Sequence, residues 1–171
     1  MEKLDNFYNN CQYTNIVEDI LNNQEFLKIG DCKHHGITRL EHSVRVSYYS
    51  YLIAKKMKLN YIAAARGGLL HDFFTKEDLS AKKQKLSVVF HPYEALENAC
   101  NNFQVTEIEK DIIINHMFPT LPHKIPKYLE SWLVSIVDKI VATYEFYYSY
   151  GKNFVYKFSN LYVILLLLNR L

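Results

Sequence analysis

Histidine and aspartate residues recur in a fixed order through most of this chain: His42, then the pair His71-Asp72, then His91, His116 and Asp138. Several of them fall on apolar faces of helix-like sequence, where an unpaired carboxylate or a bare imidazole is costly to bury. A divalent metal removes that cost, because imidazole nitrogens and carboxylate oxygens coordinate it. The number of such residues suggests a site for two metal ions.

The set as a whole carries this hypothesis. Asp138 shares a helix face with Val134 and Val141, and His116 follows two isoleucines at helical spacing, so both side chains are expected to point inward. A single residue of either kind more often pairs with a basic side chain or a backbone carbonyl. His91 is the weakest member, because it directly precedes a proline and could simply cap a helix or contact solvent.

Helices are expected to position these residues. The chain has only five glycines and four prolines, and it has no alternating segment long enough to indicate a sheet. Thr38 with Glu41, and Thr106 with Glu109, have the spacing of capping boxes, in which the two side chains satisfy free backbone N–H groups. They predict one helix over about residues 39–57 and another that ends near 116.

A glycine pair, Gly67-Gly68, lies in a third expected helix, which Asn60 caps and which runs to Leu70. Each glycine costs roughly 1 kcal/mol relative to alanine in a helix, so the pair indicates that another helix packs closely there. Further helices are predicted from Pro92 to Cys100, from Leu129 to about Tyr148 and from Asn153 onward, with Pro119, Pro122 and Pro126 in an irregular connection.

These elements predict an all-α fold, a single-domain bundle of six or seven helices over residues 1–171. The metal-site core is expected at about residues 35–145, with helices at both ends of the chain packed on it. The tyrosines concentrated near residues 48–51 and 144–150 are expected to build the core rather than to stack on bases.

The composition argues against several classes of function. The 171 residues carry a net charge of +2 with both signs interspersed, so there is no basic stripe for duplex nucleic acid. Three widely spaced cysteines fit reduced thiols better than a disulfide framework. The N-terminus has no secretory pattern, and the apolar run Leu161–Leu168 is far shorter than the roughly 18 residues that span a bilayer. We expect a cytoplasmic protein with no membrane partner.

His42, the segment Leu69-Leu70-His71-Asp72 and the pair Asp138-Lys139 resemble the H…HD…D signature of the HD superfamily of metal-dependent phosphohydrolases. The resemblance spans roughly residues 35–145. The additional His91 and His116 resemble the subset of that superfamily that holds two metals, and the chain is similar to small stand-alone bacterial HD-domain proteins.

The resemblance implies a ligand set. His42, His71, Asp72 and Asp138 would bind the first metal, and Asp72 would bridge to a second metal held by His91 and His116. The cofactors would be two divalent ions; manganese and iron are favoured, and nickel, cobalt, zinc and magnesium are compatible. Such a pair activates a water molecule and stabilises a phosphoryl group in displacement. The expected reaction is hydrolysis of a phosphoester in a nucleotide or another small phosphorylated molecule.

Basic residues near the ligands are candidates for phosphate contacts. Arg45 and Lys76 are assigned catalytic roles together with Asp72, and Arg45, Lys139 and His35 are candidates for substrate binding. Lys76 lies one place later than the lysine of HDxGK-type cyclic-dinucleotide phosphodiesterases, and the GYP element of that branch is missing, so its substrate is not expected here. His123, alone in the proline-rich connection, is expected to be exposed.

Two alternatives remain open at the level of sequence. Some members of the superfamily use the same ligands as a di-iron oxygenase, and a non-catalytic module that binds metal or senses a nucleotide would carry the same residues. The oligomeric state is also open, with a homodimer among the options.

Overall fold

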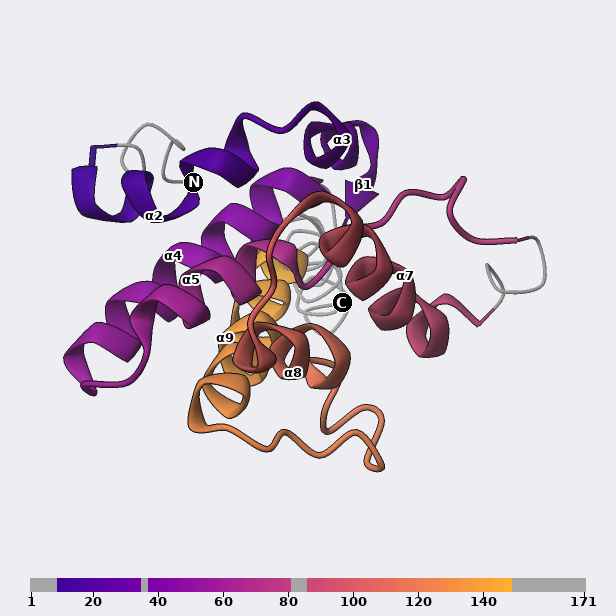
Figure 1. The fold of residues 1–171 in the computed structure, drawn as a ribbon. Coiled ribbons are helices and arrows are strands. Elements are labelled where there is room, and N and C mark those ends of the chain that lie inside the picture. The colour runs from indigo at the N-terminus through magenta and orange to yellow at the C-terminus, as the bar shows by residue number, and fades with distance from the viewer. Residues whose placement is uncertain (1–8, 35–36, 81–85, 149–171) are drawn as a thin grey trace, which may run out of the picture.

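A computed structural model describes residues 9–34, 37–80 and 86–148 of the chain (Figure 1). In order along the chain, these residues form α2 (Cys11–Leu21), α3 (Gln24–Leu27), the 3-10 helix η1 (Lys28–Asp31), β1 (Lys33–His34), β2 (Ile37–Thr38), α4 (Arg39–Lys56), α5 (Tyr61–Leu70), α7 (Ser87–Asn102), α8 (Glu107–Asn115) and α9 (Leu129–Phe146). The predicted all-α class is confirmed. The helix expected from Asn153 onward lies outside the described residues.

The helices pack around α4 and α5, which lie side by side (Figure 1). α9 packs against α4, α5 and α8, while α7 packs against α8 and α2 against α5. β1 and β2 form a two-residue antiparallel ribbon directly before α4. So short a ribbon has no alternating pattern, which is why the sequence did not indicate it.

The glycine pair of α5 packs closely against two neighbouring helices, as predicted. A Cβ atom on Gly67 would lie 2.7 Å from Cδ1 of Ile112 in α8, and one on Gly68 would lie 3.1 Å from the Cα of Ser47 in α4. Both distances are shorter than ordinary contacts, so the missing side chains let α5 approach its neighbours. These approaches fix the end of α5, where His71 follows.

Helix starts are set by the expected side chains. Thr38 and Thr106 each accept a hydrogen bond from the N–H three residues later, and Glu41 and Glu109 bond back to the cap residues. Asn60 accepts from the N–H of Ala63. Because a cap of this kind stabilises a helix by about 1 kcal/mol, the bounds of α4, α5 and α8 followed from the sequence.

The prediction for α7 was wrong, because the helix begins at Ser87 and Pro92 lies inside it. Its N-cap residue is Leu86, which makes no side-chain cap hydrogen bond, so no signal marked the start. The consequence concerns His91, which lies within the helix and not at its end. Its ring nitrogen Nδ1 bonds to the carbonyl of Ser87, one turn earlier.

Tyrosines contribute to the core in α4 but not throughout α9. Tyr51 is fully buried, whereas Tyr144 and Tyr147 are 55% and 61% exposed. The expectation that both groups of tyrosines build the core is therefore wrong for these two α9 residues. The interior side of α9 is formed instead by Val134 and Val141 in the cluster packed around Val46 and Ile112.

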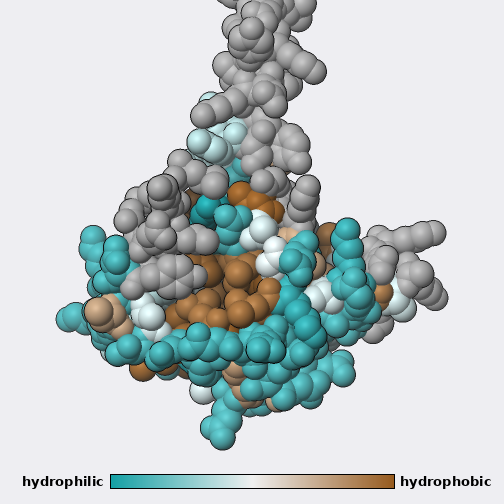
Figure 2. All heavy atoms as spheres, turned by 90° about the horizontal axis from the view of Figure 1, so that it is seen from above, coloured by the Kyte–Doolittle hydropathy of each residue, from teal (hydrophilic) through white to brown (hydrophobic). Residues whose placement is uncertain are grey.

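Figure 2 shows the molecule from above the view of Figure 1, on the side where α2 and α3 lie. On this face, apolar side chains gather within a rim of polar ones. Within the described ranges, no helix combines the length and the apolar character needed to cross a bilayer.

Candidate metal centre

Five helices deliver the predicted ligands to one place. His42 lies in the first turns of α4, His71 and Asp72 directly follow α5, His91 lies in α7, His116 follows α8, and Asp138 lies in the middle of α9. None of the six is more than 7% exposed. Residues that are distant in sequence therefore meet in the interior, and the structure brings together all six predicted metal ligands.

One half of the centre is formed around Asp138. Its Oδ1 lies 3.0 Å from Nε2 of His42 and 3.8 Å from Nε2 of His71. Oδ2 of Asp72 lies 3.8 Å from the same nitrogen of His71. His42, His71 and Asp138 offer atoms close enough to one another to hold a single metal ion.

The other half is formed around Asp72. Its Oδ1 lies 3.3 Å from Nε2 of His91 and 3.7 Å from Nε2 of His116, and the two imidazole nitrogens are 2.9 Å apart. His71, Asp72 and His116 form a second group with metal-ligand spacing. Asp72 thus reaches both halves, one with each carboxylate oxygen.

Hydrogen bonds to Nδ1 fix which ring nitrogen faces the centre. Nδ1 of His71, His91 and His116 lies 2.7–2.8 Å from the carbonyl oxygens of Gly68, Ser87 and Ile113, respectively. A carbonyl only accepts, so Nδ1 carries the hydrogen in all three rings. Each neutral ring therefore presents the lone pair of Nε2 to the centre, which is the form that binds a metal.

This arrangement fits a divalent cation. The Nε2 atoms of His91 and His116 face each other with lone pairs that cannot hydrogen-bond to one another. Nε2 of His71 is buried and has no hydrogen-bond partner among the described residues. Buried acceptors of this kind are costly unless a proton or a metal satisfies them, and the two carboxylates supply compensating charge.

Electrostatics differ between the histidines. Burial opposes protonation of His42, but hydrogen bonds to Asp138 and Glu145 outweigh it and raise its pKa to about 10. The interaction with His42 also affects Asp138. Burial alone would raise the pKa of Asp138, but His42 and the other nearby positive groups hold this pKa well below its usual value. His42 and Asp138 are therefore a charged pair when no metal is bound.

The pKa values of two other rings, His116 and His71, are shifted in the opposite direction. Burial, followed by the positive charges that His71 and His91 would carry, lowers the pKa of His116 to about 3. Burial also lowers the pKa of His71. These two rings are neutral at physiological pH and ready to act as ligands without losing a proton.

Glu145 is a member of the site that the sequence did not reveal. It is 2% exposed; its Oε2 lies 2.8 Å from Nδ1 of His42, and its Oε1 accepts from Arg45 at 2.8 Å. The available signal was its position two helical turns after Asp138, on the same face of α9. A carboxylate on the far side of a ligating imidazole orients the ring and raises its basicity.

The hydrogen bond to Glu145 fixes the position of the Arg45 side chain. It is 6% exposed and bonded to Glu145, and it does not line the cavity that adjoins the centre. The structure therefore does not bring this predicted substrate-binding and catalytic residue to the cavity.

Arg39 is the second member that sequence reasoning missed. It lines a cavity of about 370 Å³ together with Lys139 and five of the six predicted ligands. Its Nε lies 3.9 Å from Oδ2 of Asp72, and its guanidinium lies 3.8 Å from the ring centre of Phe74. Its place one turn before His42 on α4 was the signal that would have identified it.

Lys139 lies beside Asp138, as its sequence position requires. Its Nζ bonds to Oδ2 of Asp138 at 2.6 Å and to the carbonyl of His116 at 2.9 Å. It therefore connects a ligand of one half to the helix end that carries a ligand of the other.

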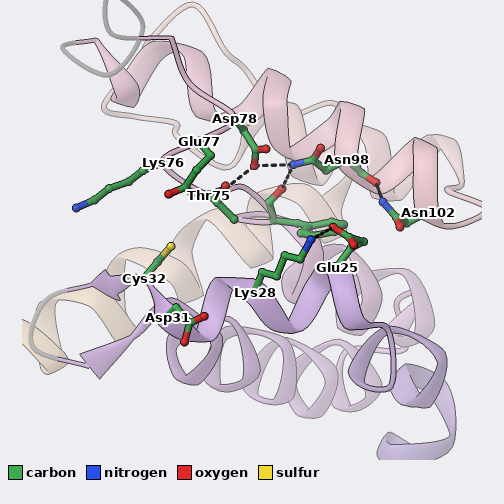
Figure 3. A pocket seen from close by; sticks show the side chains of 11 residues that line it. Glu25, Lys28, Asp31, Cys32, Thr75, Lys76, Glu77, Asp78, Asn98 and Asn102 are labelled. Atoms are coloured by element: carbon green, nitrogen blue, oxygen red, sulfur yellow. Dashed lines mark hydrogen bonds and ion pairs between the residues drawn. The ribbon is translucent and has the colours of Figure 1, made fainter.

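Lys76 lies elsewhere. It lines a different cavity, of about 700 Å³, with Asp31, Glu77 and Asp78, and Figure 3 shows its side chain extending away from the other labelled residues. His123 is exposed, as predicted. His35 lies outside the described residues.

Comparison with known families places these residues in context. Residues 39–143 match the HD domain family, and this range holds all six predicted ligands. No curated protein and no solved structure matched the chain significantly. HD domains bind divalent metals, in agreement with the clusters of histidine and aspartate in the structure. The chain belongs to the HD superfamily of metal-dependent phosphohydrolases.

Proposed function

We propose that this protein is a phosphohydrolase that cleaves a phosphoester of a nucleotide or another small phosphorylated molecule through a metal-activated water. Membership of the HD family points to a metal-dependent hydrolase in general. The observation that carries the finer proposal is the placement of two cationic side chains, Arg39 and Lys139, in the same cavity as His71, Asp72, His91, His116 and Asp138.

The ligands would hold two divalent ions, one between His42, His71 and Asp138, and one between His91 and His116, with Asp72 shared. Bound ions of this kind lower the pKa of a water molecule and stabilise charge on a phosphoryl group. The protein's own contribution is to fix the imidazoles through their Nδ1 hydrogen bonds and to keep Asp138 ionised.

Arg39 is the residue we assign to the phosphoryl oxygens. Its guanidinium is held against Phe74 by the ring contact and by a hydrogen bond from Nη1 to the Phe74 carbonyl. Among the described residues, its buried Nε makes no hydrogen bond. This N–H group is therefore a donor beside the centre that could bind a substrate oxygen. Arginine donors suit phosphate because of their planar, forked geometry. This assignment replaces Arg45, which is engaged by Glu145.

Elemental analysis of the purified protein, followed by a hydrolysis screen of phosphomonoesters, phosphodiesters and nucleotides with added manganese, iron or magnesium, tests the proposal. We expect about two metals per chain and release of phosphate or of a nucleoside. Arg39→Ala is expected to lower kcat/KM by about 10- to 100-fold, since hydrogen bonds to charged groups contribute roughly 1.5–3 kcal/mol.

The matched control is Lys110→Ala, which removes a positive charge at the surface of α8, where Lys110 pairs with Glu107. It should leave turnover unchanged. Metal-dependent oxygen uptake without phosphate release would instead identify a di-iron oxygenase. Nucleotide binding without turnover with any metal would identify a sensor.

A further inference from the structure

The outer face of α9 is apolar, although this helix carries a metal ligand on its inner face. Glu130, Asp138 and Glu145 are buried and Lys139 is partly buried, so the charged residues of the helix point inward. Seven apolar or aromatic residues of α9 and its C-cap are 36–66% exposed. All of them except Phe146 form what we call the α9 stripe: Leu129, Trp132, Ile136, Ile140, Tyr144 and Tyr147.

The stripe is continuous along the helix. Its members follow one another by three or four residues, which places them in one row on the helix surface. The other exposed positions of α9 and its cap are Thr143 and Phe146, so this face carries no charge. A surface helix normally has the reverse pattern, with charged residues outside, and contiguous exposed apolar patches mark interaction sites.

The order of residues in the stripe is symmetric about position 138. Ile136 and Ile140 lie two residues on either side of it, Trp132 and Tyr144 six, and Leu129 and Tyr147 nine. If a second copy of α9 packs antiparallel with its axis of symmetry at this level, each member meets its counterpart of similar size. Self-complementarity of this kind is the requirement for a two-fold dimer interface.

The area of the stripe also suits a dimer. Large aromatic side chains bury about 150–250 Å² each, and the three aromatic and three smaller aliphatic members of the stripe are about half exposed, so together they offer on the order of 600 Å². This is at the lower end of the roughly 600–1,000 Å² that each partner contributes to a standard interface. Tryptophan and tyrosine are enriched in such interfaces and charged residues are depleted from their centres, as they are here.

We propose that this protein forms a two-fold homodimer through antiparallel packing of the α9 stripe against the same stripe of a second copy. The two isoleucines lie at the centre, and each tryptophan contacts a tyrosine of the other copy. Because two residues of α-helix correspond to about 200° of rotation, Asp138 lies on the face opposite Ile136 and Ile140. Both metal centres therefore face away from the dimer axis, and the proposal does not depend on which reaction they perform.

The oligomeric state of the full chain in solution tests this interface. Sedimentation velocity and light scattering are expected to give the mass of two chains. Ile140→Glu, and the double variant Ile136→Glu with Ile140→Glu, are expected to give the mass of one chain. The matched control is Ile62→Glu, which changes an isoleucine that is 48% exposed on α5, away from the stripe, and should remain a dimer.

Cysteine crosslinking tests the antiparallel register. In a background where Cys11, Cys32 and Cys100 are serine, Trp132→Cys with Tyr144→Cys should form a covalent dimer on oxidation. Leu129→Cys with Trp132→Cys should not, because both cysteines then lie at one end of the helix and the corresponding end of the second copy is roughly 18 Å or more away along the axis. Crosslinking of the second pair as well as the first would indicate parallel helices, in which each position faces its own copy, and would overturn the proposed register.

A monomeric full chain would overturn the dimer itself, and circular dichroism and thermal unfolding then separate the other occupants. If Ile140→Glu lowers the melting temperature of the monomer, the stripe is covered within the chain, by residues 149–171. If the melting temperature is unchanged, the stripe is a binding surface for a different protein.

Discussion

The two halves of the metal centre are supported by different means. His42 and Asp138 are surrounded by charged groups: Glu145 on the far side of the His42 ring and Lys139 on the second oxygen of Asp138. Nδ1 of His91 and of His116 bonds to a backbone carbonyl rather than to a carboxylate, and the two rings share the carboxylate of Asp72. The first half can satisfy its own charges without a metal, whereas the second half leaves two lone pairs facing each other. We expect the first half to bind metal more tightly, since more carboxylates surround it.

The largest effect is expected where the two halves meet. Asp72→Ala removes the carboxylate that approaches both His71 and the His91–His116 pair, so both metals and the activity should be lost together. Elemental analysis of the purified variant measures this. Glu107→Ala, at an exposed side chain in the first turn of α8, is the control for loss of a carboxylate. Retention of two metals in Asp72→Ala would contradict the assignment of the centre.

A smaller effect is expected from a change confined to the second half. His116→Ala should release one metal and leave one, because His42, His71 and Asp138 remain as a complete group. His91→Ala should behave in the same way. Metal content per chain and binding isotherms for manganese or iron distinguish one site from two. Loss of both metals in either variant would show that the halves do not bind independently.

Glu145→Gln tests whether Glu145 strengthens metal binding through its hydrogen bond to His42. Amide and carboxylate have nearly the same size, but the amide is a weaker acceptor for Nδ1 of His42, so the affinity of the first half should decrease by about 10- to 100-fold. The second half should be unaffected. Competition with a chelator measures both constants. Because a purely structural role would change folding and not metal affinity, thermal unfolding of the metal-free variant is measured beside it; Glu145→Asp, which retains the charge, should recover part of the affinity.

The six histidines and aspartates that meet in the candidate centre, and most helix starts, could be predicted because their signals are local. Capping boxes at Thr38 and Thr106 and the order of histidines and aspartates need no knowledge of the fold. Glu145 and Arg39 could not be assigned in this way, because a charged residue in a helix looks like a surface residue until its neighbours are known. Arg45 shows the reverse problem, since its partner Glu145 is 100 residues away in sequence.

The orientation of α9 illustrates a second limit. The helix has valines on one face and isoleucines with aromatic residues on the other, so hydrophobicity alone does not decide which face is inside. The expected ligand Asp138 favoured the face that it shares with Val134 and Val141. The packing on α4 and α8 confirms that this face is interior and shows that Ile136 and Ile140 are exposed. The start of α7 was missed for a simpler reason: Leu86 provides no capping side chain.

The smallest effect, when it is measured over one pH unit, is expected from a difference in pH dependence between the halves. The pKa of His42 is raised to about 10 in the metal-free protein, from an ordinary value of about 6.5, so this ring holds a proton that a metal must displace. The affinity of the first half should therefore increase by up to about tenfold per pH unit as the pH rises toward 10. His116, with its pKa lowered to about 3, gives the second half no such proton to release near neutral pH.

Titration calorimetry in buffers of different ionisation enthalpy counts the protons released. With His116→Ala isolating the first half, about one proton per metal is expected from His42 at neutral pH; a value near zero would mean that His42 is already neutral. The same shift stabilises the metal-free fold fully below about pH 6.5, and this contribution is lost as the pH rises through about 10, so metal should replace a proton that otherwise holds α4 and α9 together.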